Sequence, residues 1–158
     1  SSPSLFAYER WNLGWLDDLQ IKCVSESKTT QLISPVETIG GIKAVMVPIS
    51  KTKAVVIESR RPLGIDSKLA KSGALVYVVD STNQSGFGPV KVYPSDVTSD
   101  PRYLKAPRAV GEKITIGKTK TIKNSEFKIQ NENRNDSIYY VPIILNSAFL
   151  IHNYSMPG

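Results

Sequence analysis

The feature that most constrains the fold is a series of short runs rich in β-branched residues, separated by polar turns. The most apolar run spans residues 74–79, between Gly73 and Asp80. Such an unbroken apolar run implies burial on both faces, so it predicts a central strand. Runs at residues 42–47 and 54–58 flank a short polar connection and predict a hairpin.

Further runs with a period of two predict shorter strands at residues 19–24, 29–33, 90–93, 113–116, 119–123 and 127–130. Residues 60–66 read as a loop. One helix is expected over residues 4–13, with Ser4 as its N-cap and Gly14 as its C-terminal stop. Its apolar positions are Leu5, Tyr8, Trp11 and Leu13. This pattern predicts a mainly β protein, an antiparallel β-sandwich or jelly-roll-like fold with one short N-terminal helix.

A length of 158 residues fits a single domain. We divide the chain into a helix and turn at residues 1–18, a β-sandwich domain at 19–130, and a linker with an apolar tail at 131–158. Edge strands are the structure expected in the tail, because Pro142 is excluded from a central strand. No transmembrane segment is expected, since the longest apolar run is shorter than the about 20 residues of a membrane helix.

The chain carries 20 Lys+Arg against 14 Asp+Glu, a net charge of +6 that permits binding to anionic partners. The densest basic stretch consists of Lys113, Lys118, Lys120, Lys123 and Lys128. We interpret these lysines as solvated residues that protect strand edges. A polyanion-binding surface is the alternative. No nucleic-acid motif accompanies the charge, so no nucleic-acid partner is expected.

The residues that usually perform catalysis are scarce in this chain. One His and one Cys cannot supply the nitrogen and sulfur ligands of a usual zinc site. Cys23 alternates with Ile21 toward an apolar strand face and is expected to be a small buried hydrophobe. His152 has no partner at metal-ligand spacing and reads as a surface or hydrogen-bonded histidine. We therefore assign no catalytic residue and no metal ligand, and the chain alone is not expected to be an enzyme.

Two oxygen-rich turns are candidates for calcium. Asp17 and Asp18 are adjacent carboxylates, and Asp80 precedes Asn83 and Gln84. A calcium ion takes about six to eight oxygen ligands, and neither turn has the spacing of an EF-hand. The favoured interpretation of both is a polar turn, with calcium as the alternative.

The block Tyr-Glu-Arg-Trp-Asn-Leu-Gly-Trp-Leu-Asp-Asp at residues 8–18 resembles a segment of a known family. It is similar to the segment that closes the catalytic domain of immune-inhibitor-A-type secreted zinc metalloproteases, where Leu-Gly-Trp-Leu follows the zinc helix and its Met-turn. Shorter blocks resemble the strands of the family's β domain in the same order. They lie at residues 32–37, 40–45, 56–60, 73–80, 86–90 and 111–116.

In that family the zinc motif His-Glu-x-x-His precedes the Leu-Gly-Trp-Leu block, so no zinc ligand or general base is carried over to this sequence. The resemblance implies the C-terminal β-rich portion of a secreted, extracellular zinc metalloendopeptidase, with zinc held by the parent protein. The chain opens Ser1-Ser2-Pro3-Ser4, without a Met or a signal peptide, which predicts a processed chain or an excerpt from a longer one.

The resemblance further implies that the partner is the catalytic metalloprotease domain of the same parent chain. Phe6, Trp11 and Trp15 are the residues expected to dock onto it. The accessory domain would then stabilise the catalytic domain or position its substrate. The alternative is an independent, non-enzymatic binding module for an anionic surface or polysaccharide. The oligomeric state is left open.

Overall fold

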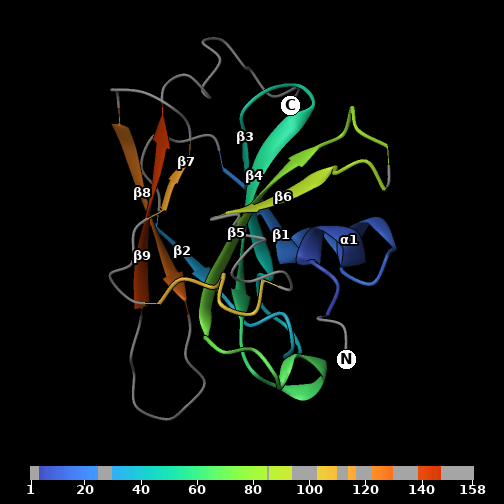
Figure 1. The fold of residues 1–158 in the computed structure, drawn as a ribbon, viewed down its shortest axis with the longest axis vertical. Coiled ribbons are helices and arrows are strands. Elements are labelled where there is room, and N and C mark those ends of the chain that lie inside the picture. Colours follow the sequence, from blue (N-terminus) through green and yellow to red (C-terminus); the bar gives the residue numbers. More distant parts are fainter. Residues whose placement is uncertain are drawn as a thin grey trace.

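The computed structural model describes residues 4–24, 30–84, 86–93, 103–109, 114–116, 122–129 and 139–146. This part of the chain is mainly β, as predicted, with one α-helix, α1 (Ala7–Asn12), and two 3-10 helices, η1 (Asp18–Gln20) and η2 (Gly64–Asp66) (Figure 1). Its strands are β1 (Ile21–Cys23), β2 (Thr30–Ile33), β3 (Ala44–Pro48), β4 (Lys53–Arg60), β5 (Gly73–Asp80), β6 (Val90–Tyr93), β7 (Ile114–Ile116), β8 (Ile122–Ile129) and β9 (Tyr139–Asn146).

A five-stranded sheet in the order β1-β3-β4-β5-β6 forms the centre of the structure. The hairpin predicted around residues 48–53 is confirmed, because β3 and β4 pair antiparallel across it. The run at residues 74–79 is confirmed as an internal strand: β5 pairs with β4 on one side and with β6 on the other. Apolar side chains from both faces of β4 and β5 are buried, as their unbroken apolar sequence requires.

The prediction of a purely antiparallel sheet is wrong. β1 runs parallel to β3 in the five-stranded sheet, which is therefore mixed. A four-stranded sheet in the order β2-β8-β9-β7 also contains parallel pairs, β2 with β8 and β7 with β9. Alternation of apolar residues reports which face of a strand is buried but carries no information about strand direction.

The C-terminal strands also differ from expectation. Residues 119–123 and 127–130 were expected to form two strands, but β8 is a single strand that pairs with β9 along its length. β9 lies between β8 and β7 and is not an edge strand. β7 pairs only with residues 143–145, so Pro142 has a strand neighbour on one side alone within the described residues. Lys128 lies on the part of β8 that pairs with both β2 and β9, so it does not protect an edge, whereas Lys123 pairs with β9 alone among the described strands.

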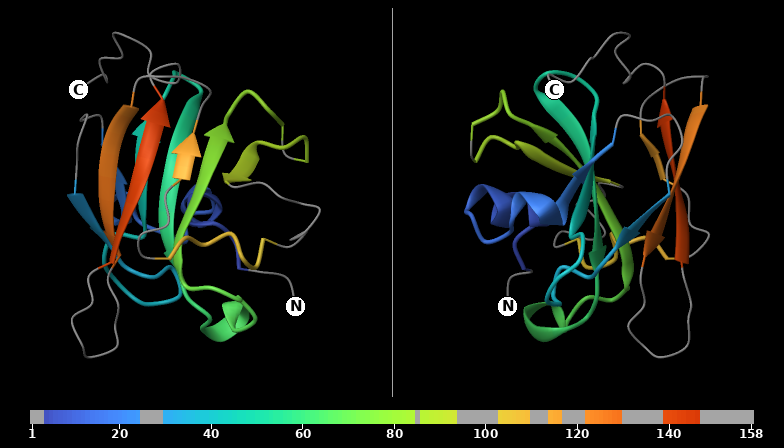
Figure 2. Two further views of the ribbon diagram at one scale, coloured as in Figure 1. Left: turned by 60° about the vertical axis from the view of Figure 1, so that its left-hand side comes forward. Right: turned by 180° about the vertical axis from the view of Figure 1, so that it is seen from behind.

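The two faces of the five-stranded sheet are covered differently. On one face, residues of β3, β4 and β5 pack with Ile33 of β2. On the other face, the core includes Ala7 of α1 together with Tyr77 of β5. Figure 2 shows α1 on one side of this sheet and the four-stranded sheet on the opposite side. None of the helices in the described ranges has the length and apolarity needed to cross a membrane.

The helix begins later than predicted. Its N-cap is Phe6, and Ser4 lies outside it with its amide bonded to Asp66. The predicted apolar face is confirmed only in part: Tyr8 packs against the core, but Leu5 and Leu13 are exposed, and the fully buried residue of the helix is Ala7. The predicted stop at Gly14 is confirmed by its φ of 73°, and the Trp15 amide bonds back to the Arg10 carbonyl at 2.8 Å.

The first strand is shorter than the predicted residues 19–24, because η1 occupies residues 18–20. Cys23 is exposed, which contradicts its expected burial. Among the described strands, β1 is a three-residue edge strand with β3 as its one neighbour, and alternation along so short a strand does not ensure a covered face. His152 lies outside the described residues, as do Lys113, Lys118 and Lys120.

Candidate functional site

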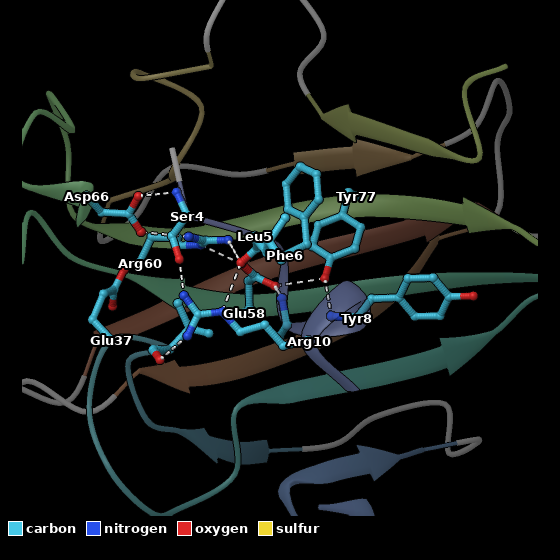
Figure 3. A network of polar contacts seen from close by, with 12 residues as sticks. Ser4, Leu5, Phe6, Tyr8, Arg10, Glu37, Glu58, Arg60, Asp66 and Tyr77 are labelled. Atoms are coloured by element: carbon cyan, nitrogen blue, oxygen red, sulfur yellow. Dashed lines mark hydrogen bonds and ion pairs between the residues drawn. The ribbon is translucent and has the colours of Figure 1, made fainter. Parts of the chain in front are cut away.

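A buried network of charged and polar side chains lies between the five-stranded sheet and the segment that leads into α1 (Figure 3). Glu58 and Arg60 share one face of β4, because side chains two residues apart point to the same side of a strand. Tyr77 comes from the neighbouring strand β5, and Asp66 comes from η2. All four residues are at most 3% exposed.

Arg60 is the cation that joins the network. Its Nε donates to Glu58 Oε1 at 2.5 Å, and its Nη1 donates to Asp66 Oδ2 at 2.7 Å. Burial alone would lower the pKa of Arg60, but the charges of Glu58 and Asp66 outweigh that effect and raise it. The guanidinium therefore stays charged, and two ion pairs compensate the cost of burying it.

Tyr77 extends the network toward the helix. Its hydroxyl donates to Glu58 Oε2 at 2.7 Å and accepts from the Tyr8 amide at 3.2 Å. Burial and the neighbouring Glu58 charge raise the pKa of Tyr77 well above its ordinary value. The hydroxyl consequently remains a proton donor at physiological pH.

The network binds the main chain of the N-terminal segment, residues 4–8. Asp66 Oδ1 accepts from the Ser4 amide at 2.7 Å, and Arg60 Nη2 donates to the Leu5 carbonyl at 2.9 Å. Glu58 Oε2 accepts from the Ala7 amide at 2.7 Å. That amide belongs to the first residue of α1, where a carboxylate satisfies an N–H that has no partner inside the helix.

Side chains of the segment add to this attachment. The Phe6 ring packs on Tyr77 with ring centroids 4.7 Å apart. Arg10 donates from Nε to the Leu5 carbonyl at 3.2 Å, from Nη1 to the Val36 carbonyl at 3.3 Å, and from Nη2 to Ser4 Oγ. The start of α1 is therefore tied to the sheet by charge-assisted hydrogen bonds and by apolar contact.

A third carboxyl group, from Glu37, lies beside this network. Glu37 Oε1 accepts from the Arg61 amide at 3.2 Å, whereas Oε2 is buried and has no hydrogen-bond donor among the described residues. Burial, together with hydrogen bonding to Asp66, raises the pKa of Glu37 to about 7, against the lowering effects of backbone hydrogen bonds and of the Arg60 charge.

The three predicted docking residues are not brought together. Phe6 is committed to packing on Tyr77 inside the chain. Trp11 is half-buried, and its indole Nε1 donates to Asp18 Oδ1 at 2.7 Å. Trp15 lies beyond the end of the helix and is 67% exposed. Among these three, only Trp15 presents most of its ring to solvent.

Trp15 belongs to a larger group of exposed apolar side chains that we call the apolar patch. Its members are Leu13, Trp15 and Leu19, with exposed fractions of 57%, 67% and 88%. They lie on residues 13–19, a segment that runs from the C-cap of α1 through the glycine turn at Gly14 into η1.

Two of the three calcium candidates have protein donors on their carboxylates. Asp18 accepts the indole N–H of Trp11, whereas the contact of Asp17 with Gln20 Oε1 at 3.1 Å is made by its main-chain amide. Asp80 pairs with Lys53 at 3.2 Å and accepts from Thr82, contacts that lower its pKa. Within the described ranges, no three side chains of His, Cys, Asp and Glu form a group that could hold a metal ion.

Sequence reasoning missed the buried network, because residues 60–66 were interpreted as a loop. Arg60 instead ends β4, and Asp66 is buried in η2. One signal was available: Glu58 and Arg60 are charges two residues apart at the end of a strongly apolar run, which places both on one face of the strand. Their ion pairing could not be read from that spacing.

Comparisons with protein-family models, with curated proteins and with solved structures give no match to this chain. The relation to the metalloprotease family therefore stays a prediction from the residues that resemble it.

Proposed function

We propose that this chain is a non-catalytic, β-rich accessory domain that docks through its apolar patch onto the catalytic domain of a secreted zinc metalloendopeptidase. The observation that carries the proposal is the exposure of Leu13, Trp15 and Leu19 on one short segment. Tryptophan and leucine side chains that the fold leaves uncovered together mark interaction sites, and tryptophan is enriched at the energetic centre of interfaces.

The way in which the helix is held supports a docking role. Residues 4–8 are fixed to the sheet through Glu58, Arg60 and Asp66, and the turn after α1 is closed by main-chain hydrogen bonds at Gly14 and Trp15. A patch mounted on a fixed segment loses little conformational entropy when a partner covers it, which favours binding.

The resemblance gives the partner its proposed identity. Its most specific block is Leu-Gly-Trp-Leu at residues 13–16, and this block contains two of the three patch residues. Leu16 is the part of the block that packs on the chain's own core, whereas Leu13 and Trp15 do not. Residues that the domain's own packing does not require are available for a partner.

The remaining features of the proposal follow from the same resemblance. The zinc ion and its ligands belong to the catalytic domain, the parent protein is extracellular, and the role of this chain is to stabilise that domain or position its substrate. The β-sandwich arrangement is also part of the proposal, supported by the core that Ile33 of β2 shares with one face of the five-stranded sheet.

The first test is the sequence of the parent gene. A His-Glu-x-x-His motif within about one domain length before Ser1 is the expected result. Its absence would overturn the metalloprotease part of the proposal. Salt-sensitive binding of the chain to an anionic polysaccharide would then favour the independent binding module, because screening weakens electrostatic attraction.

The second test is Trp15→Ser. In the isolated chain we expect the free energy of unfolding to change by no more than about 0.5 kcal/mol, because the ring is largely exposed. In the parent protein the same change should weaken docking by about 2 kcal/mol, measured as a lower melting temperature of the catalytic domain. Phe87→Ser is the matched control, an aromatic ring 78% exposed on the turn between β5 and β6. Equal effects of both variants in the parent protein would overturn the proposal.

A further inference from the structure

The segment that carries α1 is attached to the sheet at Asp66, a buried carboxylate that has the half-buried Glu37 as a neighbour. Asp66 uses one oxygen to accept from the Ser4 amide at 2.7 Å and the other to accept from Arg60 Nη1 at 2.7 Å. Glu37 lies beside Asp66, and the two labelled side chains converge on Arg60 in Figure 3. The attachment of Ser4 therefore depends on Asp66, and Glu37 is a second acid next to it.

The two carboxyl groups cannot both ionise without cost. As a carboxylate, Glu37 would leave the buried Oε2 atom without a donor among the described residues. As a neutral acid it can donate a proton to Asp66, which satisfies that atom and leaves the ion pair of Asp66 with Arg60 intact. Neighbouring like charges that are largely removed from water repel each other.

The charges that face the pair come from several elements. Arg60 of β4 contacts Asp66 directly, and Glu58 offsets part of its charge. Arg10 of α1 reaches the Val36 carbonyl, next to Glu37, and Lys43 Nζ donates to the Pro35 carbonyl at 2.8 Å. The cation in contact with the pair, Arg60, is thus already shared between two carboxylates when Glu37 is neutral.

We propose that Glu37 and Asp66 form a protonation-dependent latch on residues 4–8, closed when Glu37 is a neutral acid and loosened when it ionises. Ionisation places a second negative charge beside Asp66 and leaves the buried Oε2 atom of Glu37 without a donor among the described residues, and movement of residues 4–8 relieves both costs by admitting water. The Ser4 amide and the Leu5 carbonyl are the contacts nearest to the pair, so this end of the segment opens first. The latch holds α1, and its consequence for docking rests on the proposed function of the apolar patch.

Amide hydrogen exchange on the isolated chain between pH 5.5 and 8.5 tests the latch. The probes are the amides of Ala7 and Tyr8, which bond to Glu58 and to Tyr77, and the reference amides are those of β4 and β5. We expect the protection factors of the probes to fall about tenfold relative to the reference as the pH rises. The opening of the segment is coupled to the ionisation of Glu37, and each pKa unit of difference between the closed and open states changes the opening equilibrium tenfold.

Glu37→Gln keeps an acceptor for the Arg61 amide and a donor for Asp66 at every pH, so it should abolish the fall. Asp17→Asn, an acid-to-amide change at an exposed position, should preserve it. An equal fall in wild type and in the Gln variant, or none in wild type, would overturn the latch.

If the Gln variant does not fold, the carboxyl carbon of Glu37 in the wild-type chain is followed by NMR. A midpoint near its ordinary value of 4.5 would overturn the latch. These measurements involve no partner domain, so their failure is distinguishable from failure of the docking proposal, which the Trp15→Ser comparison decides on its own.

Discussion

Tyr77 shows how much one buried hydroxyl contributes to this network. It donates to Glu58 and accepts from the Tyr8 amide, so it joins the sheet to the first turn of α1. We expect Tyr77→Phe to lower the free energy of unfolding by about 1–3 kcal/mol in urea denaturation, because Glu58 loses a donor and a buried amide loses its acceptor.

The pH dependence of the same variant has a defined sign. Because the folded-state pKa of Tyr77 lies above its ordinary value of about 10, the hydroxyl contributes stability that is fully present below pH 10 and is lost as the pH rises beyond it. This alkaline loss should be smaller in Tyr77→Phe than in wild type. Tyr93→Phe is the matched control and should change the free energy of unfolding by less than about 0.5 kcal/mol. Equal destabilisation by both variants would contradict the role given to Tyr77.

Arg60 illustrates why the network could not be inferred residue by residue. An arginine before Arg61-Pro62 in a polar stretch reads as exposed, since charged side chains are rarely buried. It is buried here because Glu58 and Asp66 compensate its charge from two sides. The partners come from different segments, and only the folded chain brings them together.

Among the secondary-structure elements, two positions require glycine for different physical reasons. Gly14 has a φ of 73° at the end of α1, and an added Cβ would meet open space. Gly73 begins β5 with a φ of 150°, and an added Cβ would collide with the Arg108 carbonyl. The Arg108 carbonyl lies this close to Gly73 because it accepts a hydrogen bond from the next amide, that of Ala74, at 3.0 Å.

These contacts predict an ordered pair of effects. Gly14→Ala should cost about 1 kcal/mol, the conformational penalty alone. Gly73→Ala should cost more, about 2–4 kcal/mol, because the main chain around Arg108 must also shift. Thermal unfolding of both variants compares the two losses of stability. If Gly73→Ala destabilises the protein no more than Gly14→Ala does, the prediction is contradicted, because residues 103–109 then shift at little cost.

The element that departs most from expectation is α1. A pattern of apolar residues predicted a helix that starts at Ser4 and buries Leu5 and Leu13. Instead, main-chain hydrogen bonds to Asp66 and Arg60 keep Ser4 and Leu5 outside the helix. A tertiary interaction therefore sets the start of the helix, and helical periodicity is a weak signal over so few residues.

For the whole molecule, the raised pKa of Glu37 makes the free energy of unfolding depend on pH below neutrality. Its folded-state pKa is about 7, above the ordinary value of 4.5. A group with a raised folded-state pKa contributes stability at acidic pH that is lost as the pH rises, here between about 4.5 and 7, and the effect is constant above that range.

We therefore expect the free energy of unfolding to fall by about 1 kcal/mol across this range, a value reduced for the solvent that partly reaches the group. Glu37→Gln should remove this decrease, so the variant should gain stability relative to wild type at pH 8. Urea denaturation at pH 5 and pH 8 measures both. If the free energy of unfolding changes between pH 5 and pH 8 by the same amount in wild type and in Glu37→Gln, this assignment is contradicted.

The amino-acid sequence by itself determined that the chain is mainly β, that residues 42–58 form a hairpin, and that β5 is an internal strand. These features follow from β-branched runs and from burial on both faces, which are local properties of the sequence. Gly14 as the helix stop is local in the same sense.

Only the tertiary structure decided the direction of β1, the position of β9 inside its sheet, and the burial of Arg60 between Glu58 and Asp66. The same holds for the separation of Phe6 from Trp15, one ring packed on Tyr77 and the other exposed. Strand direction and ion pairing depend on which distant segments meet, and the energy of a buried charge is set by those neighbours and not by its own identity.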